Sequence, residues 1–302
     1  MSSVDTADSP ASAAVHAGTD AYRGRVIVFG TLHGKERQVA PVFADILGAQ
    51  VIAPPGLDTD QFGTFTGDIP RTLSPLDAAR AKARLAITAT GRPYALASEA
   101  SYGPLPGIGW PGHHEVLLFL DDTRDLEIMQ GHRSLAIPGP ALRATSHADI
   151  VEDLARAGWP GQAVIVRPAV PDAGRATGAD IVKGITDPDQ LTQAITTAAT
   201  RSTDGHALIE PDLRAHHNPT RREVLTQLGA TLAARLATPC PACASPGYGR
   251  TGTRPGLPCA DCGTPTDMAC ADLYSCAQCT YQHAQPRPET TTEPRWCPRC
   301  NP

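Results

Sequence analysis

The chain has 302 residues, of which 41% are hydrophobic and 19% are charged, and its formal net charge is −5. This composition is typical of a soluble globular protein with one large and one smaller domain. A net negative chain has no overall basic field for nucleic acid or acidic membranes, and no apolar run is as long as a membrane span. The N-terminus lacks the basic-then-apolar layout of a signal peptide, so we expect a cytoplasmic protein.

The first predicted elements are two strands with a helix between them. Residues 1–22 are rich in Ala, Ser and Asp, which predicts a disordered tail. The apolar run 25–30 predicts a buried strand, and the periodicity of residues 36–47 predicts a helix. A short strand over 50–53 leads into a long loop, residues 54–73, rich in Gly, Thr, Asp and Pro. Loops of this length inside a domain are often functional.

Further elements alternate along the chain up to residue 238. Ser74 and Pro75 are typical of a helix start, and this helix runs to Gly91. A strand over 94–97 is followed by a polar turn over 98–103. The remaining predicted elements are a hairpin (115–120 and 126–129), helices (147–157, 187–200 and 218–236) and strands (162–167 and 206–209). This alternation predicts one α/β domain over residues 23–238, with a mixed sheet and flanking helices.

All nine cysteines lie in the last segment, residues 239–302. Eight of them form four C-x-x-C pairs, and two such pairs complete one tetrahedral zinc site. We therefore predict tandem zinc ribbons with two structural Zn²⁺ ions. Sequential pairing along the chain is the simpler arrangement, and an interleaved arrangement is the alternative. The predicted ligands are Cys240, Cys243, Cys259, Cys262, Cys276, Cys279, Cys297 and Cys300.

The predicted ribbons have no surplus of positive charge. Five arginines balance five acidic residues in this segment, whereas backbone-driven nucleic-acid binding needs a basic surface. A structural or protein-docking role is therefore favoured over nucleic-acid binding, and a disulfide scaffold is disfavoured without secretion. Cys270 is left over as a buried or free thiol, and His283 is an alternative ligand.

The sequence TLHGKE, residues 31–36, lies between the first strand and the first helix. Backbone N–H groups and the helix dipole favour an anion at such a turn, and Gly34 permits close approach of the backbone. Thr31 and His33 supply hydrogen-bond donors, and Lys35 supplies a charge. Basic charge is otherwise carried almost wholly by arginine, because lysine occurs only at positions 35, 82 and 183. These features predict a phosphate-binding turn, and the alternative is an ordinary turn with a solvated lysine.

Carboxylates recur in the segments that follow. Glu99 ends a predicted strand between Ser98 and Ser101, a position suited to Mg²⁺ or Mn²⁺. Phosphate donors and clustered acids together predict metal-assisted attack of water on a phosphoanhydride. For Asp77 a capping role is the alternative, since it falls in the first turn of a helix. The other acidic candidates are Asp58, Asp60 and Asp68.

Residues 25–103 resemble the inosine triphosphate pyrophosphatase superfamily, the house-cleaning nucleotide pyrophosphatases. The resemblance rests on the turn 31–35, the helix segment Asp77-Ala-Ala-Arg-Ala-Lys82-Ala83 and the turn 98–101. It implies that His33 and Lys35 bind phosphate and that Asp77 and Glu99 are magnesium-binding or catalytic acids. It also implies that an arginine after Asn218-Pro-Thr, either Arg221 or Arg222, contacts base or phosphate.

The chain also resembles, over nearly its whole length, a bacterial family known only as a domain of unknown function. The segments that carry this resemblance are TLHGKE, DTDQFGTFTGDIPR, ASEASYGP, DLRAHHNPTR and GLPCADCG. This resemblance implies no activity.

Two hypotheses follow for function. The first is a metal-dependent hydrolase of a nucleotide or phosphate ester. The second is a non-catalytic protein that binds a small phosphorylated or anionic ligand and docks a protein partner through its ribbons. The sequence leaves the oligomeric state open, and it places His216 and His217 near the site. Catalytic candidates are Lys35, Asp68, Asp77 and Glu99, and ligand-binding candidates are Thr31, His33, Gly34, Arg71, Ser98, Ser101, Arg214, Asn218 and Arg221.

Overall fold

The structure is a computed structural model that describes residues 20–64, 69–105, 109–171 and 178–302. The predicted disorder of residues 1–22 therefore falls almost wholly outside the described residues, as does Asp68. Within these ranges, no helix has the length and apolar character needed to cross a membrane.

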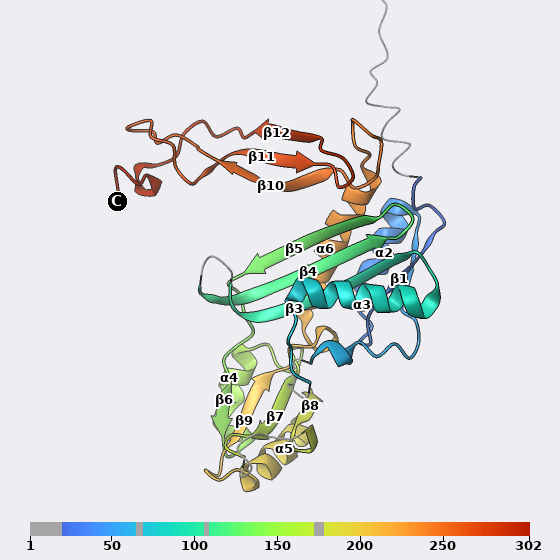
Figure 1. Cartoon of the computed structure of the whole chain (residues 1–302). Coiled ribbons are helices and arrows are strands. Elements are labelled where there is room, and N and C mark those ends of the chain that lie inside the picture. Colours follow the sequence, from blue (N-terminus) through green and yellow to red (C-terminus); the bar gives the residue numbers. More distant parts are fainter. Residues whose placement is uncertain (1–19, 65–68, 106–108, 172–177) are drawn as a thin grey trace, which may run out of the picture.

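The first sheet has five strands in the order β2-β1-β3-β4-β5, of which β1, β3, β4 and β5 are labelled in Figure 1. Strand β1 runs parallel to β2 and β3, and the pairs β3–β4 and β4–β5 are antiparallel. The sheet is therefore mixed, as the sequence predicts. Its strands are β1 (Val26–Phe29), β2 (Gln50–Ile52), β3 (Tyr94–Pro104), β4 (Pro111–Asp121) and β5 (Leu126–Ser134).

Helices cover both faces of this sheet. Helices α2 (Glu36–Leu47) and α6 (Pro219–Ala237) pack over the face that presents Phe29, Leu117 and Phe119. Helix α3 (Pro75–Thr90) packs on the other face, mainly through alanines against alanines of β3. Small side chains on both sides let α3 approach closely. At Gly30 a Cβ atom would lie only 2.4 Å from the Lys82 carbonyl oxygen of α3.

Helix boundaries follow the capping residues of the sequence. The Ser74 hydroxyl accepts a hydrogen bond from the Asp77 amide, and the Asn218 side chain accepts one from the Arg221 amide at 3.0 Å. Gly48 and Gly91 end their helices in the left-handed conformation.

Strand β3 extends well beyond the predicted end at residue 97. Residues 98–103 continue to pair with β4, with Glu99 opposite Val116 and Tyr102 opposite His113. The predicted turn at this position is therefore wrong. The polar run Ser-Glu-Ala-Ser looks like a turn in the sequence, but charged partners from distant segments allow Glu99 to be buried inside a strand.

Residues 142–211 form a second sheet that is inserted between β5 and α6 (Figure 1). Its strand order is β6-β9-β7-β8, all antiparallel, and α5 packs on β7 and β9. The insert has its own buried cluster, so the prediction of a single sheet over residues 23–238 is wrong. Strand periodicity reveals which segments are strands but not which strands pair. Its elements are β6 (Leu142–Ala144), α4 (Val151–Arg156), β7 (Val164–Pro168), β8 (Val182–Ile185), α5 (Pro188–Thr200) and β9 (Ala207–Pro211).

The C-terminal segment forms a third sheet, antiparallel in the order β10-β11-β12. It contacts the first sheet at the β4–β5 turn, where Gln278 Nε2 donates to the Arg124 carbonyl at 2.7 Å. Arg235 of α6 likewise donates to the Gly247 carbonyl at 2.9 Å. The strands are β10 (Gly249–Pro255), β11 (Ala269–Ser275) and β12 (Gln282–Pro286).

Candidate functional site

A basic pocket of about 90 Å³ lies where the first sheet meets the inserted unit. Its wall includes all three lysines of the chain, from the β1–α2 turn, from α3 and from β8. Both units therefore contribute to the pocket lining, the inserted unit through Lys183. Its lining residues are His33, Lys35, Asp60, Gly63, Thr64, Lys82, Glu99, Lys183, Arg214, Ala215 and Arg221.

Glu99 is held by two cations. Its Oε1 accepts a hydrogen bond from Arg71 Nη2 at 3.0 Å, and its Oε2 is paired with Lys82 Nζ. Burial by itself would raise the pKa of Glu99, but Lys35 and Lys82 outweigh this effect and keep the pKa below its usual value. Glu99 is therefore an ionised carboxylate whose two oxygens both have partners.

Glu115 is a second buried carboxylate held by a cation, and it lies on the other face of the sheet. Arg221 donates from Nε and Nη2 to the two carboxylate oxygens at 2.8 and 2.9 Å, and both side chains are buried. Arg221 outweighs burial and lowers the pKa of Glu115 to about 2. The remaining Nη1 of Arg221 donates to the Leu213 carbonyl at 2.7 Å. His113 also contacts Glu115, at 3.2 Å, and stacks on Tyr102.

Lys35 differs from these cations. Its Nζ donates to the Ser98 carbonyl at 3.0 Å, and no carboxylate among the described residues lies within ion-pair distance of it. The residue is only 8% exposed. Burial and the nearby Arg221 lower its pKa to about 8. Lys35 is thus a buried cation without an acidic partner in the described chain.

The TLHGKE turn also brings His33 into the pocket. The His33 ring stacks on His216 at a centroid distance of 4.9 Å, and its Nε2 lies 3.3 Å from Asp60 Oδ1. Thr31 stabilises the turn by accepting a hydrogen bond from the His33 amide at 3.1 Å. Gly34 adopts a φ of +66°, a conformation that favours glycine. Burial lowers the pKa of His33, so its ring is neutral at pH 7.

The eight C-x-x-C cysteines form two groups of four. Within each group, Sγ–Sγ contacts of 3.6–3.9 Å join cysteines of different motifs. A tetrahedral site with Zn–S bonds of about 2.3 Å places its sulfurs about 3.8 Å apart. Two zinc ions therefore fit these groups. The groups are Cys240, Cys243, Cys276 and Cys279, and Cys259, Cys262, Cys297 and Cys300.

The grouping is interleaved, so the sequential pairing favoured by the sequence is wrong. The first motif pairs with the third and the second with the fourth, because the antiparallel strands β10 and β11 return the chain to where β10 began. The first two motifs share the pattern P-C-x-x-C-x-x-P, and the outer prolines of each form a bridge. Cys270 belongs to neither group, and its thiol contacts the Pro255 carbonyl at 3.3 Å. His283 also lies outside both groups.

A protein-family model for a domain of unknown function matches residues 82–302. The chain belongs to the DUF6671 family. The match spans Lys82, Glu99, the inserted unit and both cysteine groups, and it assigns no activity. A search of curated proteins finds no match.

The structure of this DUF6671 chain brings many of the predicted site residues together. His33, Lys35, Glu99, Arg214 and Arg221 line the basic pocket. Four others contact or carry these residues: Arg71 donates to Glu99, the Ser98 carbonyl accepts from Lys35, and Thr31 and Gly34 belong to the turn that carries His33 and Lys35. Asn218 caps α6 and donates to the Tyr102 hydroxyl at 3.3 Å.

Other predicted residues lie elsewhere, and some lining residues escape sequence reasoning. Asp77 is at the exposed start of α3 with Ser74 and Arg80, which is the capping role. Ser101 is on β3 outside the pocket lining. Glu115 carried no sequence signal, and the only signal for Lys183 was the rarity of lysine.

The described residues around the pocket do not fit a resident Mg²⁺ or Mn²⁺ ion. Both oxygens of Glu99 accept from cations, and Asp60 faces His33. The pocket wall also carries more positive than negative side chains, which repels a divalent cation. Among the described residues, the two cysteine groups are the clusters suited to a metal.

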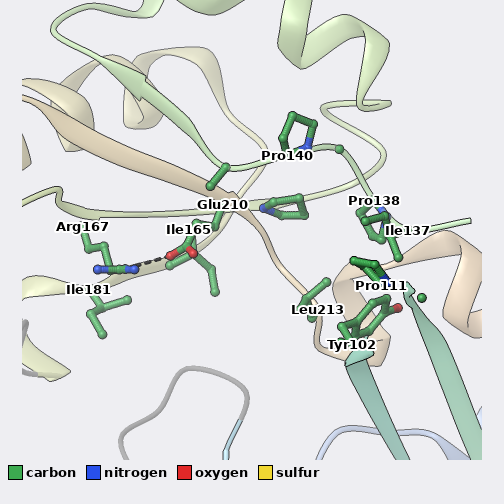
Figure 2. Close-up of a pocket in the computed structure, with 15 residues that line it drawn as sticks. Tyr102, Pro111, Ile137, Pro138, Pro140, Ile165, Arg167, Ile181, Glu210 and Leu213 are labelled. Atoms are coloured by element: carbon green, nitrogen blue, oxygen red, sulfur yellow. Dashed lines mark hydrogen bonds and ion pairs between the residues drawn. The ribbon is translucent and has the colours of Figure 1, made fainter. Parts of the chain in front are cut away.

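A larger cavity of about 660 Å³ lies nearby; Leu213 lines this cavity, and the next residue, Arg214, lines the basic pocket. In its wall Arg167 Nε donates to Glu210 Oε2 at 2.8 Å. Figure 2 shows these two side chains facing one another, with Tyr102 and Pro111 on the side of the first sheet. The other residues that line this larger cavity are Ile, Leu, Pro, Gly or Ala. This cavity offers space and apolar surface, whereas the smaller pocket holds the charges.

Proposed function

We propose that the chain binds a small phosphorylated or otherwise anionic molecule in the basic pocket, with Lys35 as the central contact. The observation that carries this proposal is the buried Lys35 ammonium, which has only a backbone carbonyl as its partner among the described residues. A buried charge without a counter-ion is unfavourable. A bound anion would supply the missing charge.

The other charges of the pocket support this proposal. Glu99 is neutralised by Arg71 and Lys82, and Glu115 by Arg221. Glu99 and Glu115 are therefore satisfied internally. Lys183 adds positive charge to the wall, whereas Arg214 is ion-paired with Asp212 at 2.6 Å. Phosphate oxygens accept several charge-assisted hydrogen bonds at once, which suits a ring of lysine and arginine donors. The larger cavity nearby has room for an apolar part of such a ligand.

Thermal unfolding with added pyrophosphate, phosphate or nucleotides tests the proposal. A ligand at one hundred times its Kd stabilises the folded state by about 2.7 kcal/mol. We expect this stabilisation in the wild type and in Lys35→Arg, which keeps the charge, and its loss in Lys35→Met. The exposed Arg92→Met is the control for a simple change in net charge. Equal stabilisation of wild type and Lys35→Met would reject Lys35 as the contact.

A metal-dependent hydrolase of a nucleotide or other phosphoanhydride is the second candidate; because the described residues of the pocket do not fit a resident ion, its Mg²⁺ or Mn²⁺ would have to arrive with the nucleotide. It is favoured by the convergence of His33, Lys35 and Arg221 around Glu99, because such donors also stabilise the charge of phosphoryl transfer. Release of phosphate or pyrophosphate from nucleotides with Mg²⁺ or Mn²⁺ tests it. Turnover that Lys35→Ala and Glu99→Gln both abolish supports the hydrolase, and stabilisation without turnover supports a binding protein. The likeness to the pyrophosphatase superfamily belongs to this candidate.

We infer a structural role for the zinc groups and a protein-docking role for the C-terminal sheet. The sheet contacts the rest of the chain at the β4–β5 turn and the end of α6, so most of its surface faces away from the basic pocket. Its charges balance, which favours a protein partner over nucleic acid. The cytoplasmic location stays a prediction.

A further inference from the structure

Three lysines share the basic pocket, but their surroundings differ. Lys82 is ion-paired with Glu99, and Lys183 approaches from the inserted unit. Lys35 Nζ has a backbone carbonyl as its acceptor, and its 8% exposure faces the pocket that it lines. The hydrogen bond to the Ser98 carbonyl at 3.0 Å positions Nζ at the wall of the pocket.

Charged groups surround Lys35 from every element packed against it. Arg221 of α6 and Lys82 of α3 oppose its positive charge, whereas Glu99 of β3 and Glu115 of β4 favour it. His33 lies in the same turn, and Arg214 comes from the crossing to α6. Burial and Arg221 outweigh the acids and lower the pKa of Lys35 to about 8. At pH 7, roughly one tenth of the molecules then carry Lys35 as an unprotonated amine. For an exposed lysine this fraction is less than about one thousandth.

We propose that Lys35 forms an imine with the carbonyl carbon of a phosphorylated aldehyde or ketone. Amines that lie next to other cations in a buried site are the ones that proteins use as nucleophiles. This inference rests on the proposed anion site, since the phosphate of the same ligand would lie in the basic pocket, whose wall also includes Lys82 and Lys183. It names the ligand class as an anion that also carries a carbonyl group.

The reaction is a condensation without redox change. The lone pair of Nζ attacks the carbonyl carbon, and the π electrons of the C=O bond move to oxygen, which takes up a proton. The resulting carbinolamine loses its hydroxyl together with a proton as water, and a C=N bond forms. One amine and one carbonyl thus give one imine and one water molecule.

Reductive trapping tests the proposal, with pyridoxal 5′-phosphate as the probe. Borohydride converts the imine to a stable secondary amine, which peptide mass spectrometry locates. The map is simple because the chain has three lysines and one terminal amine. We expect Lys35 to be labelled at least about tenfold faster than Lys82 or Lys183 at pH 7. Unphosphorylated pyridoxal should label it more slowly, and inorganic phosphate should compete.

Two variants separate the imine from the anion site. Lys35→Arg keeps a positive charge but forms no trappable imine, so phosphate should still stabilise it while labelling falls to background. Arg92→Lys adds an exposed lysine as an internal reference amine. Phosphate-dependent stabilisation with Lys35 labelled no faster than this reference would overturn the imine and leave the anion site standing. Absence of both stabilisation and labelling would overturn both proposals.

Discussion

Arg221 of α6 and Glu115 of β4 form a bidentate ion pair that is buried from solvent, with exposures of 1% and 0%. Glu115 pairs with Ala100 of β3, the residue after Glu99. Neighbouring residues of a strand face opposite sides, so Glu99 faces α3 and Glu115 faces α6. Each helix supplies the cation for the carboxylate on its own face, and Lys35 lies between the two pairs.

Removing the charge of Glu115 should destabilise the fold strongly. Glu115→Gln leaves Arg221 as a buried cation without its counter-ion, and we expect a loss of about 3–5 kcal/mol. Denaturant unfolding measures the change. Glu127→Gln is the matched control, because Glu127 makes a similar pair with Arg80 at a site where both side chains are 37% exposed. The control should lose no more than about 1 kcal/mol, and equal losses in the two variants would contradict a special role for burial.

Lys35 should make stability depend on pH in a defined window. Its pKa is lowered in the folded chain, so the unfolded chain binds more protons between about pH 8 and the ordinary value near 10.5. Below this window Lys35 is protonated in both the folded and the unfolded chain. Folding there carries the full cost of burying the charged ammonium group. Wild-type stability relative to Lys35→Met should therefore rise with pH by on the order of 3 kcal/mol across the window. Urea unfolding of both proteins at pH 7, 8, 9 and 10 measures the difference, and a constant difference would refute a lowered pKa.

The interleaved cysteine groups predict a specific pattern of zinc loss. Cys243→Ser with Cys276→Ser changes one group, so the double variant should keep one zinc ion. Cys243→Ser with Cys262→Ser changes both groups and should lose both ions. Native mass spectrometry counts the metal in each. Sequential pairing would give the opposite pattern, with one ion retained in the second variant and none in the first.

The close approach of β1 and α3 should make Gly30 sensitive to substitution. An added Cβ would lie 2.4 Å from the Lys82 backbone oxygen, so Gly30→Ala must push α3 away from the sheet. We expect a loss of about 1–3 kcal/mol and weaker anion binding, since the shift carries Lys82 with it. Gly252→Ala is the control, because nothing lies within 4 Å of that position. Unchanged stability of Gly30→Ala in denaturant would contradict the packing of α3.

Local sequence signals predicted the helices and strands well but not their partners. Ser74, Asn218, Gly48 and Gly91 mark helix ends because capping depends on neighbouring residues alone. The burial of Glu99 depends on Lys82 and Arg71, which lie in other segments, so its strand looked like a turn. The four C-x-x-C motifs have identical spacing, and spacing alone therefore does not reveal which motifs share a metal.

In the candidate site, too, residues close together in the sequence are predictable, whereas contacts between distant segments are not. The TLHGKE turn carried a readable signal because its hydroxyl, imidazole and lysine lie within five residues. Lys183 lies about 150 residues away in the inserted unit, and only the packing of that unit against the first sheet brings it to the pocket. Glu115 sits in an apolar strand whose pattern gives no hint of Arg221 across the core.

The inserted unit is joined to the first sheet by two stretches of chain, residues 135–141 and 212–218. A body attached at two points keeps one rotation, about the line that connects them. A ligand that contacts Lys35 on one unit and Lys183 on the other adds an attachment away from that line and removes the rotation. Binding in the pocket should then slow amide hydrogen exchange in both connecting stretches. Exchange within the two sheets should stay unchanged.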